Sequence, residues 1–263
     1  MKNAKYRNEI VYLPGGTDEF NGFGVDATIR NQVGSPIGLV YGYRADGIYN
    51  TQAEAESAGL FWVDAKGFQH AFRAGDVKFV NVNNSDNVID DADRVVIGEP
   101  NPDFTGMFYN KFTYKKFTLD FIFTFSKGND IYNALRAKTE AMIDFSNQSA
   151  AVANRWKVEN QVSDVPRAEY GDPTGNSRFS DRWIEDGSYM RLKSLTFSYT
   201  PDLKLNFIKG VTFFVSANNL LTFSKYLGYD PEVSMSGNSY LQGIDAGMVP
   251  QFKSVFAGFR LGL

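Results

Sequence analysis

Cysteine is absent from the 263 residues, and histidine occurs once, at His70. The lack of thiols excludes disulfides, thiolate metal sites and a cysteine nucleophile. A single histidine in an acidic, loop-like stretch gives no nucleophile–base triad. The sequence also has no phosphate-binding GxxxxGK[ST] pattern and no zinc-ligand spacing. We therefore expect a protein that is not an enzyme.

Long apolar runs are missing as well. No stretch approaches the ~18 apolar residues that a membrane-spanning helix needs, and the mean hydropathy is below zero. The net charge of -3 is too small to indicate a nucleic-acid partner. The first ten residues, MKNAKYRNEI, contain no apolar segment of the kind found in signal peptides. We therefore expect neither a helical membrane protein nor a nucleic-acid-binding protein, and expect the sequence to be part of a longer, exported chain.

Aromatic residues are abundant, at 15% with 23 Phe and 14 Tyr, and many of them alternate with polar residues. The clearest case is 117–126, where five large apolar residues share one face of a predicted strand, namely Phe117, Leu119, Phe121, Phe123 and Phe125. Thr118, Asp120, Ile122 and Thr124 fall on the opposite face. This pattern fits a strand between lipid and a wet lumen, or one that buries a face in a soluble β-sandwich. The length of the apolar face favours the membrane barrel.

Two more strands show the same alternation. In 188–200, Leu195 and Phe197 share a face, but the apolar residues before Lys193 have the opposite parity. This change of phase predicts either a β-bulge near 193–194 or an upper strand that has left the membrane. In 252–262, the apolar side contains Val255, Phe259 and Leu261. We predict that these five residues face lipid, together with the five of 117–126.

The order of strands and loops predicts an orientation. The expected strands are 4–12, 36–49, 105–115, 117–126, 188–200, 211–219 and 252–262, with short helices near 52–58 and within 128–145. In outer-membrane barrels the periplasmic turns are short and the extracellular loops are long. We therefore predict periplasmic turns near 115–117 and 201–210. The long segments 50–104, 127–187 and 220–251 are then extracellular, and the segment 13–35 is longer than a periplasmic turn should be.

Several stretches also resemble one family. YGYRADGIYNTQAEA, GEPNPDFTG, NLLTFSKYLGYDPEV and the whole run 154–200 are similar to the C-terminal part of SusC/RagA-type TonB-linked outer-membrane transporters. The resemblance covers about 36–263. It implies an all-β, antiparallel, partial and open wall of a barrel of ~22 strands, with long extracellular loops that carry short helices. It also implies that residues 1–263 lack the plug domain and the TonB box.

The resemblance further implies a function. Complete members import oligosaccharides or peptides across the outer membrane of Bacteroidetes-type Gram-negative bacteria, with a SusD-like surface lipoprotein and the TonB complex as partners. The expected surroundings are outer-membrane lipid, and no cofactor is expected apart from calcium. Two alternatives remain open at this point. One is a soluble β-sandwich that binds glycans through exposed aromatic residues, and the other is a passive porin.

The loop 81–93, NVNNSDNVIDDAD, is the one stretch that suggests a metal site. Asp86, Asp90, Asp91 and Asp93 crowd together there, and calcium prefers several oxygen ligands on a tight turn. The loop resembles a DxNxDGxxD calcium-binding pattern that many relatives carry. It departs from that pattern because Asn81 replaces the first aspartate, one residue is inserted, and Asn87 stands in place of glycine. The alternative is a solvated acidic loop.

Overall fold

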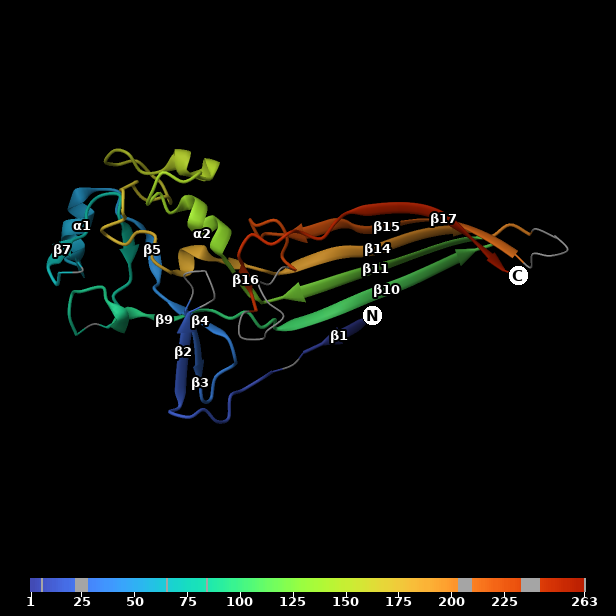
Figure 1. Ribbon diagram of the computed structural model, residues 1–263, viewed down its shortest axis with the longest axis horizontal. Coiled ribbons are helices and arrows are strands. Elements are labelled where there is room, and N and C mark those ends of the chain that lie inside the picture. Colours follow the sequence, from blue (N-terminus) through green and yellow to red (C-terminus); the bar gives the residue numbers. More distant parts are fainter. Residues whose placement is uncertain are drawn as a thin grey trace.

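A computed structural model describes residues 1–5, 7–21, 28–64, 66–83, 85–202, 210–232 and 242–262. The molecule is elongated, with a curved sheet at one end and a folded unit at the other (Figure 1). We call the sheet the wall and the folded unit the head. Each is built from strands, and helices are short and confined to the head.

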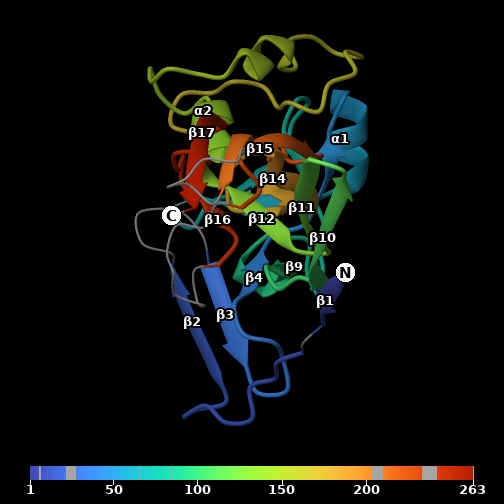
Figure 2. The same cartoon turned by 90° about the vertical axis from the view of Figure 1, so that its right-hand side faces the viewer.

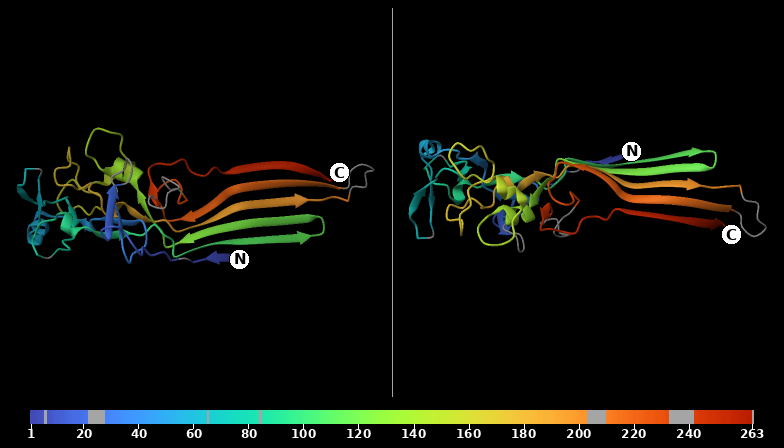
Figure 3. Two further views of the ribbon diagram at one scale, coloured as in Figure 1. Left: turned by 60° about the horizontal axis from the view of Figure 1, so that its bottom comes forward. Right: turned by 90° about the horizontal axis from the view of Figure 1, so that it is seen from above.

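The wall is antiparallel, with the strand order β1-β10-β11-β14-β15-β17. Its members are β1 (Lys2–Ala4), β10 (Phe104–Tyr114), β11 (Phe117–Lys127), β14 (Tyr189–Tyr199), β15 (Gly210–Ser224) and β17 (Ser254–Gly262). The sheet bends along its width without closing, as both views of Figure 3 show. Among the described residues, β1 and β17 each pair on one side only. The predicted partial, open barrel wall is therefore confirmed.

Connections of different length lie at opposite ends of the wall. Only two residues, 115 and 116, link β10 to β11 at the far end. The described residues of the three long connections, 5–103, 128–188 and 225–253, lie at the other end, where they build the head (Figure 1). This agrees with the expected turn near 115–117 and with the expected long loops, whereas the predicted turn near 201–210 lies largely outside the described residues. The described part of 13–35, expected on the side of the short turns, lies instead in the head, where it forms strands of a small sheet.

The first two predicted strands are placed differently. Only Lys2–Ala4 pairs with β10, so β1 takes the position beside β10 that was expected for 36–49. Residues 36–49 instead contribute β4 (Leu39–Gly42) and β5 (Ala45–Ile48) to the head. The adjacent residues Leu39 and Val40 are both buried, so this strand is covered on both faces. Period-two alternation alone does not distinguish these environments.

The head contains several small sheets. β2 (Thr17–Asn21), β3 (Thr28–Gln32), β4 and β9 (Val95–Gly98) form one of them. β5 pairs with β8 (Val77–Phe79), and β6 (Phe61–Val63) pairs with β7 (Gln69–Ala71). β12 (Asp130–Asn133) lies between β13 (Ile184–Asp186) and β16 (Ile244–Asp245). Seen along the wall, β2 and β3 extend to one side and the helices lie on the other (Figure 2).

The helices of the head are short. α1 (Gln52–Ala58) confirms the predicted helix and is capped by the Thr51 side chain. The predicted helix within 128–145 is shorter, because the chain first forms β12 and then α2 (Ala134–Glu140), which Asn133 caps in place of Asp130. The 3₁₀ turns are η1 (Asp91–Asp93), η2 (Ala150–Asn154) and η3 (Asp181–Trp183). No helix among the described residues is both long and apolar enough to cross a membrane.

Two apolar cores hold the head together. One joins three of the long connections and contains Ile29, Val40, Tyr132, Ala134, Phe179, Trp183 and Ile244. The other is built from residues of a single connection, all between 48 and 89 in the sequence, namely Ile48, Tyr49, Ala55, Phe72, Val77, Phe79 and Ile89. The first core fixes the three connections relative to one another at the end of the wall, where the cavity described below lies.

Candidate functional site

The wall has one continuous apolar face. Residues directly opposite each other in a sheet share a face, and the strand register places Leu119 beside Phe197, Phe197 beside Val215, and Phe213 beside Phe259. Several side chains on this face are exposed, with 47% for Phe197 and 63% for Phe259, whereas Leu192 on the same face is buried. All ten predicted lipid-facing residues lie on this face: Phe117, Leu119, Phe121, Phe123, Phe125, Leu195, Phe197, Val255, Phe259 and Leu261.

The opposite face of the wall is mostly polar. Asp120 pairs with Thr196, and Thr196 in turn pairs with Ser216. The hydroxyl groups of Thr196 and Ser216 are 2.8 Å apart and hydrogen-bonded. Phe214 and Phe256 also lie on this side and meet edge to face. The wall therefore separates an apolar surface from a hydroxyl-rich one.

A β-bulge at Lys193 keeps the two faces separate along β14. Ile122 and Phe123 are neighbours in β11, but their partners in β14 are Ser194 and Leu192, so Lys193 is the extra residue. The bulge returns Leu192 to the apolar face and leaves Arg191 on the polar face. Of the two alternatives left by the sequence, the structure shows the bulge.

An ionic cluster lies on the polar face where the wall meets the head. Arg191 of β14 pairs with Asp230 and Glu232 of the connection after β15, and its side chain is only 3% exposed. Lys193 lies 3.1 Å from Glu232, and the Tyr189 hydroxyl donates to the same carboxylate. For Asp230, burial acts to raise the pKa, but the hydrogen bonds from Arg191 and from backbone N–H groups leave it below the ordinary value. The cluster ties this connection to the wall.

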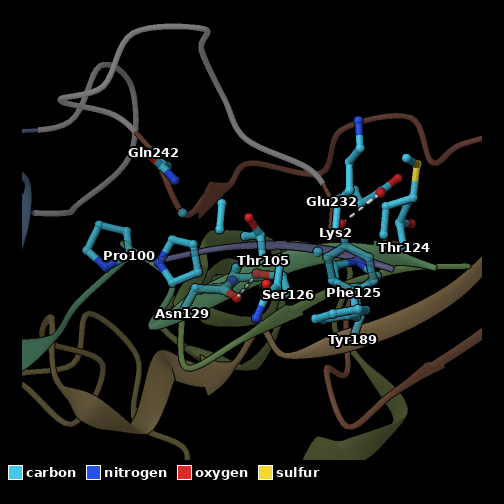
Figure 4. Close-up of a pocket in the computed structure, with 18 residues that line it drawn as sticks. Lys2, Pro100, Thr105, Thr124, Phe125, Ser126, Asn129, Tyr189, Glu232 and Gln242 are labelled. Atoms are coloured by element: carbon cyan, nitrogen blue, oxygen red, sulfur yellow. Dashed lines mark hydrogen bonds between the residues drawn. The ribbon is translucent and has the colours of Figure 1, made fainter. Parts of the chain in front are cut away.

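A cavity of about 650 Å³ adjoins this cluster. Figure 4 shows its lining, to which Thr105, Thr124 and Ser126 contribute from the polar face and Tyr189 and Glu232 from the ionic cluster. Ser126 donates to the Asn129 side chain within it. The predicted lipid-facing residue Phe125 also contributes to the lining. The cavity is thus a mixed polar and apolar space at the head end of the wall.

The carboxylates of loop 81–93 do not converge. Asp93 is fully buried and accepts hydrogen bonds from the backbone N–H groups of 82, 83 and 90. Asp90 caps η1, and Asp86 accepts from the Val88 N–H. The Asp91 side chain is 90% exposed and accepts from Tyr43.

The described side chains of this loop form no carboxylate cluster. Among the described residues, which exclude 84 in this loop, no group of three or more Asp, Glu, His or Cys side chains is arranged to hold a metal ion. The loop is instead closed by backbone bonds to Asp93. The calcium interpretation remains a prediction without support from this arrangement.

The single histidine is also placed outside any catalytic arrangement. His70 lies in β7, where its ring stacks on Trp62 at 4.6 Å and its Nε2 lies 3.0 Å from Asp64. Hydrogen bonds from the Phe68 N–H and from His70 keep the pKa of Asp64 below its ordinary value. This pair braces the β6–β7 hairpin at the tip of the head.

The sequence reasoning missed the ionic cluster. Its members in β14 are 39 to 43 residues away from their partners in the following connection, so no local pattern connects them. The one feature of the sequence that could have indicated this cluster is Arg191, because a charged residue within an amphipathic barrel strand requires a partner.

No protein-family model matches the chain. Sequence comparison finds relatives in Formosa agariphila, among them the TonB-dependent receptors P3 and P26. They are 31% and 30% identical over 98% and 97% of this chain. The TonB-dependent receptor SusC of Bacteroides thetaiotaomicron is 25% identical over 97% of the chain. The chain belongs to the SusC/RagA group of TonB-dependent receptors.

Comparison with solved structures gives the same fold. The RagAB peptide importer in its open-open state matches with a TM-score of 0.69 at 21% identity, covering 97% of this chain. Its closed-closed state matches with a TM-score of 0.67. These relatives are receptors and transporters by name, in agreement with the expectation of a protein that is not an enzyme. The chain spans only about a quarter of the relatives' length, 26% for P3 and 23% for SusC.

Proposed function

We propose that this TonB-dependent receptor chain forms part of the wall and the extracellular loops of an outer-membrane nutrient importer. The observation that carries this proposal is the division of the wall into two faces. Apolar residues of adjacent long strands share one side, and several of them, such as Phe117, Phe197 and Val255, are exposed. A transmembrane barrel requires such a face against lipid and a polar face toward its lumen.

The separation of short and long connections supports an orientation. The 115–116 turn would face the periplasm, and the head would face the outside of the cell. The open edges at β1 and β17 would pair with further barrel strands, because unpaired backbone groups in lipid cost several kcal/mol each. The 650 Å³ cavity on the polar face would then open into the lumen.

The transported substrate would be an oligosaccharide or a peptide, delivered by a SusD-like surface lipoprotein. The match to the RagAB peptide importer supports the peptide class, and the oligosaccharide class rests on the resemblance of the sequence to the SusC/RagA group. Energy would come from the TonB complex through a plug domain and TonB box that lie outside residues 1–263, and this chain would correspond to the C-terminal part of the receptor. The location would be the outer membrane of a Bacteroidetes-type bacterium.

A pair of substitutions in β11 tests the membrane assignment. Phe121→Lys places a cation on the apolar face at the middle of the strand, where it should cost about 2–4 kcal/mol in lipid. Asp120→Asn changes the neighbouring residue on the polar face and is the matched control. We expect outer-membrane levels of the complete receptor to fall for the first variant and to remain unchanged for the second.

Other outcomes would favour the alternatives. Equal membrane levels for the two variants would contradict the lipid-facing assignment. A monodisperse, detergent-free monomer would favour the soluble sandwich, since the exposed apolar face should otherwise cause aggregation. Uptake that persists without TonB would favour a passive porin.

A further inference from the structure

Two lysines lie at the head end of the apolar face of the wall. β11 ends at Lys127, which continues the parity of Phe125 and pairs with Phe104 of β10. Lys225 directly follows β15 and continues the parity of Phe223. Both lysines are exposed, and they stand where two neighbouring parts of the wall pass into the head (Figure 3). Because alternate residues of a strand share a face, the two lysines fall on the apolar side of the wall.

The strand register brings these lysines into one row. β14 lies between β11 and β15, and the next position beyond its paired residues is Ser188, between Lys127 and Lys225. The Ser188 hydroxyl accepts from the Gly128 N–H at 3.0 Å, and its carbonyl accepts from the Ser224 hydroxyl at 3.1 Å. Strands two positions apart are separated by about 10 Å. Two long lysine side chains can therefore reach one group placed above the small Ser188.

A single carboxylate serves both ammonium groups. Asp186 Oδ2 lies 3.7 Å from Lys127 Nζ, and both side chains are exposed. Hydrogen bonds from Ser188, together with the charges of Lys127 and Lys225, keep the pKa of Asp186 below its ordinary value. Lys225 forms no ion pair of its own with any residue that the structure describes. The row thus carries two positive charges and one negative charge, and it is open to a further anion.

Apolar side chains accompany this charge on the same face. Phe104, Met190 and Phe223 come from three different strands of the wall, and all three are exposed. Phe104 lies directly opposite Lys127, and Met190 pairs with Phe223 two residues along the strands from the lysine row. A free phosphate would contact only the lysines. A phosphorylated lipid would contact the lysines with its headgroup and cover the apolar side chains with its acyl chains.

We propose that Lys127 and Lys225 bind a phosphate group of lipid A in the outer leaflet of the outer membrane. With the head outside the cell, the head end of the apolar face lies at the level of the outer-leaflet headgroups. Lipid A is the phosphorylated lipid of that leaflet in Gram-negative bacteria, and its charge is complementary to the lysine row. The proposal rests on the membrane orientation in the import function and adds a specific lipid contact to it.

Native mass spectrometry of the complete receptor in detergent tests this proposal. The probe is diphosphoryl lipid A, titrated against the unsubstituted receptor and against the double variant Lys127→Gln, Lys225→Gln. We expect the double variant to bind lipid A at least about tenfold more weakly, since each lysine near an anionic lipid surface contributes about fivefold. Both lysines are exposed, so the variant should fold. Lys138→Gln is the matched control, because Lys138 is exposed in α2, outside the wall.

Three further probes identify the group that is recognised. Dephosphorylated lipid A and phosphatidylglycerol should bind more weakly than diphosphoryl lipid A, and inorganic phosphate should not displace it. Displacement by inorganic phosphate would overturn the lipid assignment. Equal binding of dephosphorylated lipid A would overturn the role of the phosphate, and equal binding of phosphatidylglycerol would overturn the choice of lipid A. Equal affinity of the double variant, or no binding of lipid A, would overturn the site.

The failure of this inference is distinguishable from the failure of the import function. A receptor that binds no lipid A but reaches the outer membrane and takes up nutrient with TonB would leave the import function intact. Loss of outer-membrane localisation in the unsubstituted receptor would overturn the membrane assignment. The titration in detergent would still decide whether these two lysines bind lipid A.

Discussion

The Arg191 guanidinium donates a hydrogen bond to the Asp230 carboxylate, and each side chain is only 3% exposed. Asp230 also accepts from the backbone N–H groups of Glu232 and Gln251. One pair of buried charges therefore joins a wall strand to two points of a long connection. Since the pair is removed from solvent, its loss should affect stability far more than the loss of a surface ion pair.

Removal of the arginine should destabilise the receptor strongly. Arg191→Met leaves Asp230 buried without its partner, and breaking a buried pair in this way costs about 3–5 kcal/mol. Urea unfolding of the complete receptor in detergent measures the loss, and Arg191→Met with Asp230→Asn should recover part of it. Lys127→Met is the control, because Lys127 and Asp186 form an exposed pair at 3.7 Å. An equal loss in both single variants would contradict the proposed role.

Insertion of one alanine after Lys193 should impair assembly in the outer membrane. The bulge already accommodates one extra residue, and a second would turn the side chains of β14 before residue 193 to the opposite faces. Arg191 would then lie on the apolar side, where a cation costs up to about 2–4 kcal/mol in lipid. Deletion of Lys193 removes the extra residue, keeps Leu192 and Arg191 on their present faces, and should assemble normally. Surface labelling of intact cells compares the two variants, and normal levels of the insertion variant would contradict this role of the bulge.

Asp93 should be essential for the shape of loop 81–93. Asp93→Ala removes the acceptor of three backbone N–H groups, and each buried unsatisfied donor costs about 1–3 kcal/mol. Limited proteolysis should therefore cleave this loop faster, while Asp91→Ala, at an exposed position, should leave the rate unchanged. Calorimetry with millimolar calcium tests the metal interpretation separately. Heat of binding that Asp93→Ala abolishes would support the calcium site, and its absence would leave Asp93 with the structural role alone.

Asp130 should make the head less stable as the pH rises. Burial raises the pKa of Asp130 above its ordinary value, and the hydrogen bond from the Glu99 N–H offsets only part of this effect. The folded state thus favours the protonated form. The stability that protonated Asp130 contributes to the folded state is fully present below the unfolded pKa of about 3.9. This stability is lost as the pH rises through the folded pKa.

Asp130→Asn should therefore raise the melting temperature at pH 7 and have little effect near pH 4. The asparagine side chain keeps an acceptor for the Glu99 N–H without the buried charge. Melting curves of the two receptors between pH 4 and pH 8 measure the difference. A gain that does not depend on pH would contradict the assignment to Asp130.

The sequence predicted the wall where each strand has one apolar face. In β11 and β17 the alternation alone identified the strands and their faces, and the change of parity around Lys193 restricted β14 to two alternatives. Alternation of apolar and polar residues gave a wrong prediction for 36–49, which is not a strand of the wall. There Leu39 and Val40 are buried side by side in the head, and glycine and tyrosine at alternate positions imitate a barrel strand.

The cavity, the ionic cluster and the contacts between the long connections could not be predicted from the sequence. Glu185, Arg136 and Leu227 meet because three long connections share one apolar core, and their separations of 42 and 49 residues leave no local pattern. In the acidic loop 81–93, closeness in sequence does not bring the carboxylates together. Backbone hydrogen bonds turn them in different directions.

The pairing of Gly42 with Val95 has a consequence for how such receptors diversify. The segment 43–94 leaves and re-enters the fold at adjacent points, so its replacement by another sequence would not shift the register of any wall strand. The segment is not autonomous, because Asp76 pairs with Arg167 and Trp156 packs on its core. The smallest exchangeable module is therefore 43–94 together with 155–183, and recombination between receptors should preserve these two pieces as a unit.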